Sequence, residues 1–341
     1  MSEHVKPNGR VTMADVAREV GVSMMTVSRV VNDKGDVSSA TRQRVLEAIE
    51  RLGYRPSGIA RGLATRRTGT LGLVIPDVAN PFFAEVARGV EHVAYAEGYN
   101  VFLCNTDEDP QRELDVLGSL EEKRVDGIVL CSSRLDDDDL EMAVDSHPSV
   151  VLVNRRLDAN LRVGAVIVDD VNGGRIMTQH LIRRGHRSIG FLAGPQGSHS
   201  GQGRLAGYRQ ALSEAGLRPK PAWVRHCAPV ADDGHEVALL LLSQHPELTA
   251  VLCYNDLVAV GVLRACAELG YGVPEDLAVT GFDDIPLAAL VTPSLTTCRI
   301  PRHELGVKAV DLLLDQIRGE PTHEGEILVL QPELVVRASA P

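Results

Sequence analysis

Polar side chains that could bind a hydroxyl-rich molecule follow most of the short apolar runs between residues 69 and 285. Carboxylate and amide groups pair well with neighbouring hydroxyls, and an aromatic ring face can cover the C–H surface of the same ligand. Taken one at a time, these residues could equally be loop caps or turn residues. Together they indicate a polar small-molecule site, with these members: Asp77, Asn80, Phe82, Phe83, Asn105, Thr106, Ser132, Asn154, Arg155, Asn255, Asp256, Asp283 and Asp284.

The segments that must position these side chains alternate between apolar runs and helical patterns. LGLVIP at 71–76 precedes a predicted helix at 82–97, and NVFLC at 100–104 precedes another. Similar runs follow: DGIVLC, SVVLVN, AVIVDD and, after a predicted helix at 173–184, SIGFLAG, WVRHCA, AVLCYN and LAVTGF. This alternation predicts two similar lobes, each a parallel sheet flanked by helices, with the ligand beyond the carboxyl ends of the strands.

A second candidate site lies in the fragment GVSMMTVSRVVND at 21–33. Gly21 can take the positive φ that ends a helix, and Ser23 can cap the next helix. Helical spacing places Val27, Val30 and Val31 on one face of that second helix. The opposite face carries Met25, Ser28, Arg29 and Asn32.

Two further short helices are predicted beside it. The first has apolar residues at helical spacing (Met13, Val16, Ala17 and Val20), and Thr12 with Asp15 forms a sequence pattern typical of a capping box. The third starts near Ser38 or Ser39, buries Val45, Ile49 and Leu52, and stops at Gly53. Three helices of this length can bury only one small common core, so the second helix keeps a free face.

Two helices joined by a tight glycine turn can form a helix-turn-helix whose second helix enters a major groove. Arg29 could bind guanine O6 and N7, Ser28 could reach a phosphate or a base edge, and the methionines could contact thymine methyl groups. The simpler alternative is a helical hairpin with a solvated face. Spacing by itself does not separate the two interpretations.

The charge distribution favours the DNA-binding interpretation. The whole chain of 341 residues has a net charge of −11, but residues 1–67 hold 12 Lys or Arg against 7 Asp or Glu, which is +5. The remaining residues hold 23 against 39, which is −16. A basic amino-terminal module on an acidic body is typical of a nucleic-acid-binding protein whose other lobes have a separate task.

Several function classes find little support in the sequence. No stretch approaches the roughly 20 apolar residues of a membrane span, and the N-terminus lacks a secretory signal, so we expect a cytoplasmic protein without a membrane partner. The six cysteines are scattered without CxxC spacing, and we expect neither a metal site nor a cofactor. No catalytic motif appears, so we expect no catalytic residues and no enzyme. Two weaker alternatives are a dinucleotide fingerprint in GQGRLAG (201–207) and a cation site at 136–139.

Several motifs, in order, resemble the lactose repressor/galactose repressor family of bacterial transcription regulators. VTMADVAREVGVSMMTVSRVVND and the residues after it, up to LGLVIPD, are similar to the amino-terminal signature of that family. The resemblance continues through GHRSIGFLAGP, RLAGY, YNDLVAVG, GFDDIP and PSLTT, and so covers essentially the whole chain.

The resemblance implies an N-terminal all-α helix-turn-helix domain on an α/β two-lobed, periplasmic-binding-protein-like body with parallel sheets. The implied boundaries are a DNA-binding domain at 1–56, a hinge helix or linker at 57–68, and an effector-binding and dimerisation domain at 69–341. Within the body, the first lobe would comprise about 69–168 and 299–326. The second lobe would comprise about 169–298 and 327–341.

The resemblance also implies residue roles. DNA contacts would come from Thr12, Met24, Met25, Thr26, Ser28, Arg29, Asn32, Tyr54, Ala60 and Leu63, with Leu63 wedged into the minor groove by a hinge that orders on the operator. Glycines at 58 and 62 depart from the family pattern. Because glycine weakens a helix, the hinge is expected to be looser here. Effector contacts would come from Asp77, Asn80, Phe82, Phe83, Asn154, Arg155, Arg204, Asn255 and Asp283.

These features predict a homodimeric transcriptional regulator, most simply a repressor, that binds double-stranded operator DNA and a small-molecule effector. NPFF and LCNTDED are similar to ribose-type regulators, but Ile300 stands where that subgroup has a glutamine. A pentose, another monosaccharide and a nucleoside therefore remain open as effectors. The alternative functions are a sugar-binding protein of the transport class and an enzyme with an accessory DNA-binding domain.

Overall fold

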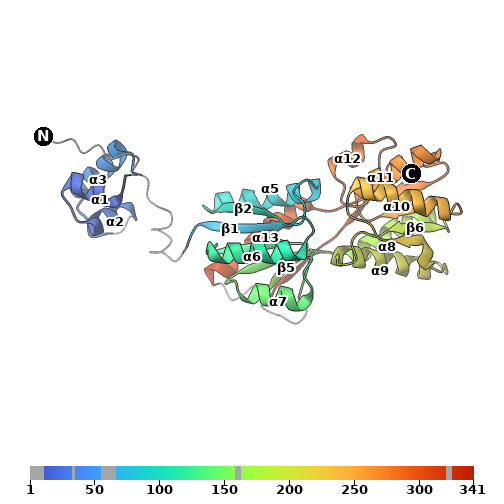
Figure 1. Cartoon of the computed structure of the whole chain (residues 1–341), viewed down its shortest axis with the longest axis horizontal. Helices are drawn as coiled ribbons and strands as arrows, with labels where there is room; N and C mark the ends of the chain where they lie inside the picture. The colour runs from blue at the N-terminus through green and yellow to red at the C-terminus, as the bar shows by residue number, and fades with distance from the viewer. Residues whose placement is uncertain (1–10, 33–34, 55–66, 158–162, 320–324) are drawn as a thin grey trace. The chain divides into compact units, whose positions relative to one another are not determined.

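The structure of the protein is a computed structural model that describes residues 11–32, 35–54, 67–157, 163–319 and 325–341. The chain divides into two compact units, Met1–Thr68 and Gly69–Pro341. The first unit is helical and the second is an α/β body (Figure 1). The two units are considered separately below.

The amino-terminal unit contains α1 (Met13–Val20), α2 (Met24–Val31) and α3 (Ser39–Leu52). The side chain of Asp15 accepts hydrogen bonds from the backbone N–H of Thr12 (3.0 Å) and from its hydroxyl (2.6 Å), which fixes the start of α1. Gly21 ends α1 with φ of 71°, and the hydroxyl of Ser23 accepts from the N–H of Thr26 at the start of α2. The predicted helix-turn-helix is confirmed.

The core of this unit is small and consists mainly of valines. Its buried members are Val16, Ala17, Val20, Val27, Val30, Val45, Ala48 and Tyr54. The predicted buried stripe of α3 was partly wrong: Ala48 is buried with Val45, whereas Ile49 and Leu52 are only half-buried. A small alanine lets α3 approach α1 and α2 closely, which leaves the larger side chains at the margin of the core.

The first lobe of the body is built on a six-stranded parallel sheet in the order β11-β5-β4-β3-β1-β2. Its strands are β1 (Thr70–Ile75), β2 (Asn100–Asn105), β3 (Gly127–Cys131), β4 (Val150–Val153), β5 (Gly164–Val168) and β11 (Ile327–Leu330). Alternating side chains of β1 point to opposite faces, with Leu71 and Leu73 on one face and Val74 on the other. The helices around this sheet are α5 (Pro81–Ala96), α6 (Pro110–Glu122), α7 (Asp137–Asp145) and α13 (Arg302–Arg318).

The second lobe has a four-stranded parallel sheet in the order β7-β6-β8-β9. Its strands are β6 (Ile189–Leu192), β7 (Val224–Arg225), β8 (Ala250–Cys253) and β9 (Ala278–Thr280). Figure 1 shows the surrounding helices at the far end of the body from α5 and α6. They are α8 (Asp170–Arg183), α9 (His199–Glu214), α10 (Ala231–Gln244) and α11 (Asp256–Leu269), with the short α12 (Pro286–Leu290) nearby. The predicted two-lobed α/β body is confirmed.

Within the described residues, the chain crosses between the lobes after β5, after β10 (Thr297–Arg299) and after β11. The third crossing leads to β12 (Glu333–Val335), which pairs antiparallel with β10. The predicted lobe boundary at 326 needs a correction. Because β11 pairs with β5, in the register Leu328↔Val166, residues 327–330 belong to the first lobe.

Among the described residues, no helix is long and apolar enough to cross a membrane.

Candidate functional site

The exposed face of α2 carries the side chains expected at a DNA interface. Met24 and Met25 are 58% and 66% exposed, and Arg29 is exposed as well. Val27 and Val30, on the other face, are buried in the core of the unit. Large apolar side chains are rarely left in solvent beside a cation without a binding role. The free face predicted for the second helix is therefore present.

The remaining predicted DNA-contact residues of this unit differ in their accessibility. Thr12 is exposed, while Thr26, Ser28 and Asn32 are half-buried, and the amide of Asn32 donates to the backbone oxygen of Ser28 (2.8 Å). Tyr54 requires a correction, because it is only 7% exposed and belongs to the core. Gly53, with φ of 64°, turns the chain there, and the N–H of Tyr54 donates to the oxygen of Ile49 (2.9 Å).

The hinge residues Ala60 and Leu63, and the two glycines at 58 and 62, lie outside the described residues.

The second site lies between the lobes of the body, where strands end in strained backbone. Six non-glycine residues have positive φ after these strands, and four of them line one cavity: Glu108 (60°) after β2, Ser132 (50°) after β3, Asn154 (56°) after β4 and Asp283 (103°) after β9. This conformation costs L-residues on the order of 1 to 3 kcal/mol each. Such strain is typical of binding sites, and here it turns side chains at the strand ends into one cavity.

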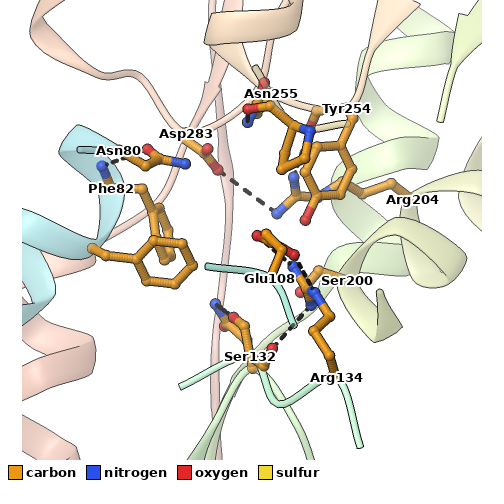
Figure 2. A pocket seen from close by; sticks show the side chains of 13 residues that line it. Asn80, Phe82, Glu108, Ser132, Arg134, Ser200, Arg204, Tyr254, Asn255 and Asp283 are labelled. Atoms are coloured by element: carbon orange, nitrogen blue, oxygen red, sulfur yellow. Dashed lines mark hydrogen bonds and ion pairs between the residues drawn. The ribbon is translucent and has the colours of Figure 1, made fainter. Parts of the chain in front are cut away.

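That cavity, here called the inner pocket, contains about 340 Å³ of space free of protein atoms, including the part open to solvent. Residues of both lobes line it, and Figure 2 shows most of them. It unites seven of the nine predicted effector-contact residues: Asn80, Phe82, Phe83, Asn154, Arg204, Asn255 and Asp283. Parallel strands deliver their carboxyl ends to one edge of a sheet, which explains how residues so distant in sequence meet.

Arg204 is the electrostatic centre of the inner pocket. Its Nε donates to Asp170 Oδ1 (2.8 Å), its Nη1 donates to the backbone oxygen of Tyr254 (2.6 Å), and its Nη2 lies 3.7 Å from Asp283 Oδ1. The guanidinium also stacks 3.7 Å from the ring centroid of Phe282. Burial alone would lower the pKa of Arg204, but the nearby carboxylates outweigh it and raise this pKa, so the side chain stays charged.

The carboxyl groups around Arg204 have unusual proton affinities. Burial raises the pKa of Asp283 to about 7, although Arg204 and Arg302 act in the opposite direction. Burial likewise raises the pKa of Asp170. Asp283 therefore changes charge close to neutral pH, at the centre of the inner pocket.

Three buried oxygen atoms of the inner pocket have no hydrogen-bond partner: the acceptors Asn154 Oδ1 and Asp283 Oδ1, and the hydroxyl of Ser200. A buried acceptor without a donor costs about 1 to 3 kcal/mol, so a ligand that donates to it gains affinity. Asn80 and Asn255 behave differently. Their side-chain oxygens accept from the N–H groups of Phe82 (2.9 Å) and Val258 (2.8 Å) and so cap α5 and α11.

Aromatic rings form the apolar part of the wall. Phe82 and Phe83 lie edge to face, with ring centroids 5.1 Å apart. Tyr254 belongs to the second lobe, and its hydroxyl lies 3.0 Å from the Ser198 hydroxyl at the start of α9. Figure 2 shows Phe82 and Tyr254 on different sides of the pocket.

Sequence reasoning missed three charged or aromatic members of the inner pocket: Glu108, Arg134 and Tyr254. All three follow predicted strands and therefore satisfied the strand-end criterion. Glu108 lies in NTDED, Arg134 in CSSR and Tyr254 in CYN. They were missed because the sequence does not show which loop residues face inward.

Two predicted effector-contact residues are not in the wall of the inner pocket. Asp77 lines the wider groove outside it and accepts from the N–H of Ala79 (2.8 Å). Arg155 turns away and binds Asp137 (2.5 Å) and His199 Nδ1 (3.2 Å). Asn154 has a φ of 56°, and with the chain turning there, Asn154 lines the pocket while Arg155 is directed to other partners.

The weaker motifs have structural roles. GQGRLAG lies within α9, where a Cβ on Gly207 would sit 2.0 Å from the backbone oxygen of Val171 in α8, so this glycine allows close helix packing. Asp136 caps α7, and the three aspartates after it form the first turn of that helix. In the described part of the chain, no group of three or more His, Cys, Asp or Glu residues is placed to hold a metal ion.

Comparison with protein families defines the class of this protein. Residues 12–57 match the bacterial regulatory proteins of the lacI family, and residues 68–332 match the periplasmic binding proteins and sugar binding domain of the LacI family. The chain therefore belongs to the LacI family of bacterial regulatory proteins, and it is a DNA-binding transcriptional regulator.

Two curated relatives show how far the similarity extends. The HTH-type transcriptional repressor PurR of Haemophilus influenzae (strain PittEE) is 36% identical over 330 residues, covering 96% of this chain and 98% of that protein. Catabolite control protein A of Priestia megaterium is 37% identical over 330 residues, covering 96% and 99%. Both matches include the helix-turn-helix and both lobes.

Solved structures are similar over most of the chain or all of the body. A lac repressor dimer bound to operator and the anti-inducer ONPF has a TM-score of 0.87 at 29% identity, covering 97% of this chain and 99% of that chain. The regulator CelR in complex with cellobiose has a TM-score of 0.75 at 36% identity, covering 97% and 100%. An Enterococcus faecium regulator with bound ribose has a TM-score of 0.71 at 28% identity, covering 80% and 98%. These matches do not single out the ribose-type subgroup.

Proposed function

We propose that this protein is a repressor whose operator binding is controlled by a neutral, hydroxyl-rich small molecule in the inner pocket. The observation that carries this proposal is the pair of buried acceptors without donors, Asn154 Oδ1 and Asp283 Oδ1. Asn154 belongs to the first lobe and Asp283 to the second. A ligand with several hydroxyl groups could donate to both and so connect the lobes. A monosaccharide fits this description best, and the relative with bound ribose agrees with it, whereas the relative in complex with cellobiose binds a sugar of two rings.

A nucleoside is the second candidate effector. The aromatic rings of Phe82, Phe83 and Tyr254 favour it, because a base could stack where a monosaccharide offers only C–H surface. The ribose of a nucleoside would still present two hydroxyls to the unsatisfied acceptors. For either ligand, we propose that the protein binds the molecule without converting it.

We further propose a homodimer formed along one edge of the first lobe. β2 is the terminal strand of the six-stranded sheet, and its Phe102 and Leu103 are 46% and 44% exposed. Tyr95, in the adjacent α5, is 78% exposed. Apolar side chains on a sheet edge of this kind favour association with another subunit. Two copies of α2 could then occupy two operator half-sites.

The control of DNA binding would pass through the lobes. A ligand that connects Asn154 to Asp283 changes the angle between the lobes, because the three crossing segments act as hinges. We propose that this movement, transmitted across the dimer, changes the affinity of the amino-terminal unit for the operator.

A thermal-shift screen against ribose, glucose, other monosaccharides and nucleosides tests the effector class. A cognate ligand at 100 times its dissociation constant should add about 2.7 kcal/mol to the free energy of unfolding. The hits are then added to operator-binding titrations and recovered afterwards to check that they are unchanged. Stabilisation by none of these compounds, or by a hit that leaves operator affinity unaltered, would refute the proposal.

A further inference from the structure

Two cavities meet between the lobes of the body. The inner pocket opens into a wider space, here called the outer groove, which contains about 1320 Å³ free of protein atoms by the same measure as the 340 Å³ of the inner pocket. Three residues line both: Glu108, Arg134 and Pro229. These three residues lie where the two cavities adjoin and are here called the partition.

Glu108 and Arg134 of this partition are joined by a two-point ion pair. Arg134 Nε lies 2.5 Å from Glu108 Oε2, and Arg134 Nη2 lies 3.1 Å from Glu108 Oε1. The third nitrogen, Nη1, donates to the backbone oxygen of Ser132 (2.9 Å). With the side chain of Arg134 only 7% exposed, the guanidinium occupies the opening instead of extending into solvent.

The partition extends from one lobe to the other. Arg134 and Glu108 come from the first lobe, whereas Tyr254, which lines the same inner pocket, comes from the second. Pro229, also from the second lobe, completes the rim. Figure 2 shows Glu108, Arg134 and Tyr254 together at the pocket.

Backbone strain holds the ion pair in place. Asp107 and Glu108 are consecutive non-glycine residues with φ of 59° and 60°, and the N–H of Glu108 donates to the backbone oxygen of Pro76 (3.2 Å). On the other side, the N–H of Arg134 donates to the buried carboxylate of Glu113 (2.9 Å). A strained turn persists only where the surrounding structure enforces it. Both partners are thus positioned by their own loops before they meet.

We propose that the Glu108–Arg134 pair is the specificity gate of the effector site and restricts the effector to one small ring system. This inference rests on the proposed function and names its size class. Inside the gate, the inner pocket holds about 340 Å³ of space free of protein atoms, against about 1320 Å³ in the outer groove. A second sugar ring would have to displace the ion pair and strand a charge beside it, which is how a site rejects a competitor.

The gate can be tested without knowing the effector. Ser200 lines only the inner pocket, so Ser200→Cys provides a thiol behind the gate. The full-length variant is treated with methyl methanethiosulfonate, which is small, and with N-(1-pyrenyl)maleimide, which has four fused rings. The labelling rates of the wild-type protein are subtracted, because its own six cysteines also react.

The measured quantity is the ratio of the large-reagent rate to the small-reagent rate. Combining Ser200→Cys with Glu108→Ala and Arg134→Ala removes both charges of the gate together. This combination should raise the ratio at least tenfold. Adding Arg88→Ala instead deletes an arginine whose side chain is 74% exposed in α5, and the ratio should not change. A ratio that stays the same in the double variant would overturn the gate.

A ligand experiment separates this inference from the proposed function. Wild type and the Glu108→Ala/Arg134→Ala variant, both checked for a cooperative unfolding transition, are screened with glucose, ribose, inosine and cellobiose. We expect cellobiose to stabilise the double variant only. If cellobiose stabilises the wild type as much as any monosaccharide does, the gate is refuted and the carbohydrate proposal stands. If no compound stabilises the wild type, the proposed effector class fails, and the labelling ratio still decides the gate.

Discussion

Asp283→Asn is the substitution that most directly tests the electrostatics of the inner pocket. It replaces a buried carboxyl group, 5% exposed and 3.7 Å from Arg204 Nη2, by an amide of the same shape. The neighbouring Asp170 remains to pair with Arg204 (2.8 Å). The variant therefore removes one titrating group without stranding the arginine.

The magnitude follows from the pKa of Asp283, which burial raises from 3.8 to about 7. Below about pH 4 the carboxyl is protonated in both the folded and the unfolded protein and contributes nothing. Between about pH 4 and pH 7 the unfolded chain loses this proton and the folded protein keeps it, so stability falls as pH rises. Three pH units at about 1.4 kcal/mol each correspond to a loss of roughly 4 kcal/mol, which levels off above pH 7.

The asparagine variant cannot lose this stability, so its free energy of unfolding should rise relative to wild type between pH 5 and pH 8. Urea unfolding followed by the fluorescence of Trp223 measures this, because Trp223 is the single tryptophan and is buried in the second lobe with Asp283. Asp138→Asn, at an exposed position of α7, is the matched control. If the free energies of unfolding of Asp283→Asn and wild type differ by the same amount at pH 5 and at pH 8, the reasoning is refuted.

Three other substitutions test the remaining conclusions. Arg29→Ala should reduce discrimination between operator and random DNA by about 1 to 3 kcal/mol in binding titrations, and an equal loss on both DNAs would exclude a base contact. Arg204→Ala leaves the carboxylates of Asp170 and Asp283 without their cation. It should lower the free energy of urea unfolding by about 3 to 5 kcal/mol at pH 8, with a smaller loss at pH 5. A loss that does not depend on pH would show that the unpaired carboxylates are not its cause. Gly207→Ala brings a Cβ to 2.0 Å from Val171 O and should lower the free energy of unfolding by on the order of 3 kcal/mol. Its control, Gly118→Ala in the open interior of α6, should raise this free energy by about 0.5 to 1 kcal/mol. Equal effects of the two variants on the melting temperature would contradict the α8–α9 packing.

The amino-acid sequence by itself determined the elements of this protein and their order. Helical spacing of Val16 and Val20, the glycine at 21 and the serine at 23 define the helix-turn-helix through local backbone geometry. Apolar runs of strand length define the parallel sheets in the same way, and the strand-end rule locates the inner pocket. The helix caps and the alternation of strands and helices are predictable because they depend on residues close in sequence, whereas the strand pairings themselves join distant segments such as Leu71 and Gly127.

The tertiary structure decided which of the strand-end side chains act together. Arg204 meets Asp170 and Asp283, which are far apart in the chain, and Glu108 meets Arg134 only because β2 and β3 end at the same edge of the first-lobe sheet. Nothing in the sequence distinguishes Asn154, which faces the pocket, from Arg155, which turns to Asp137 and His199. The physical reason is that such partnerships depend on loop backbone angles and on burial, and packing between distant segments sets both.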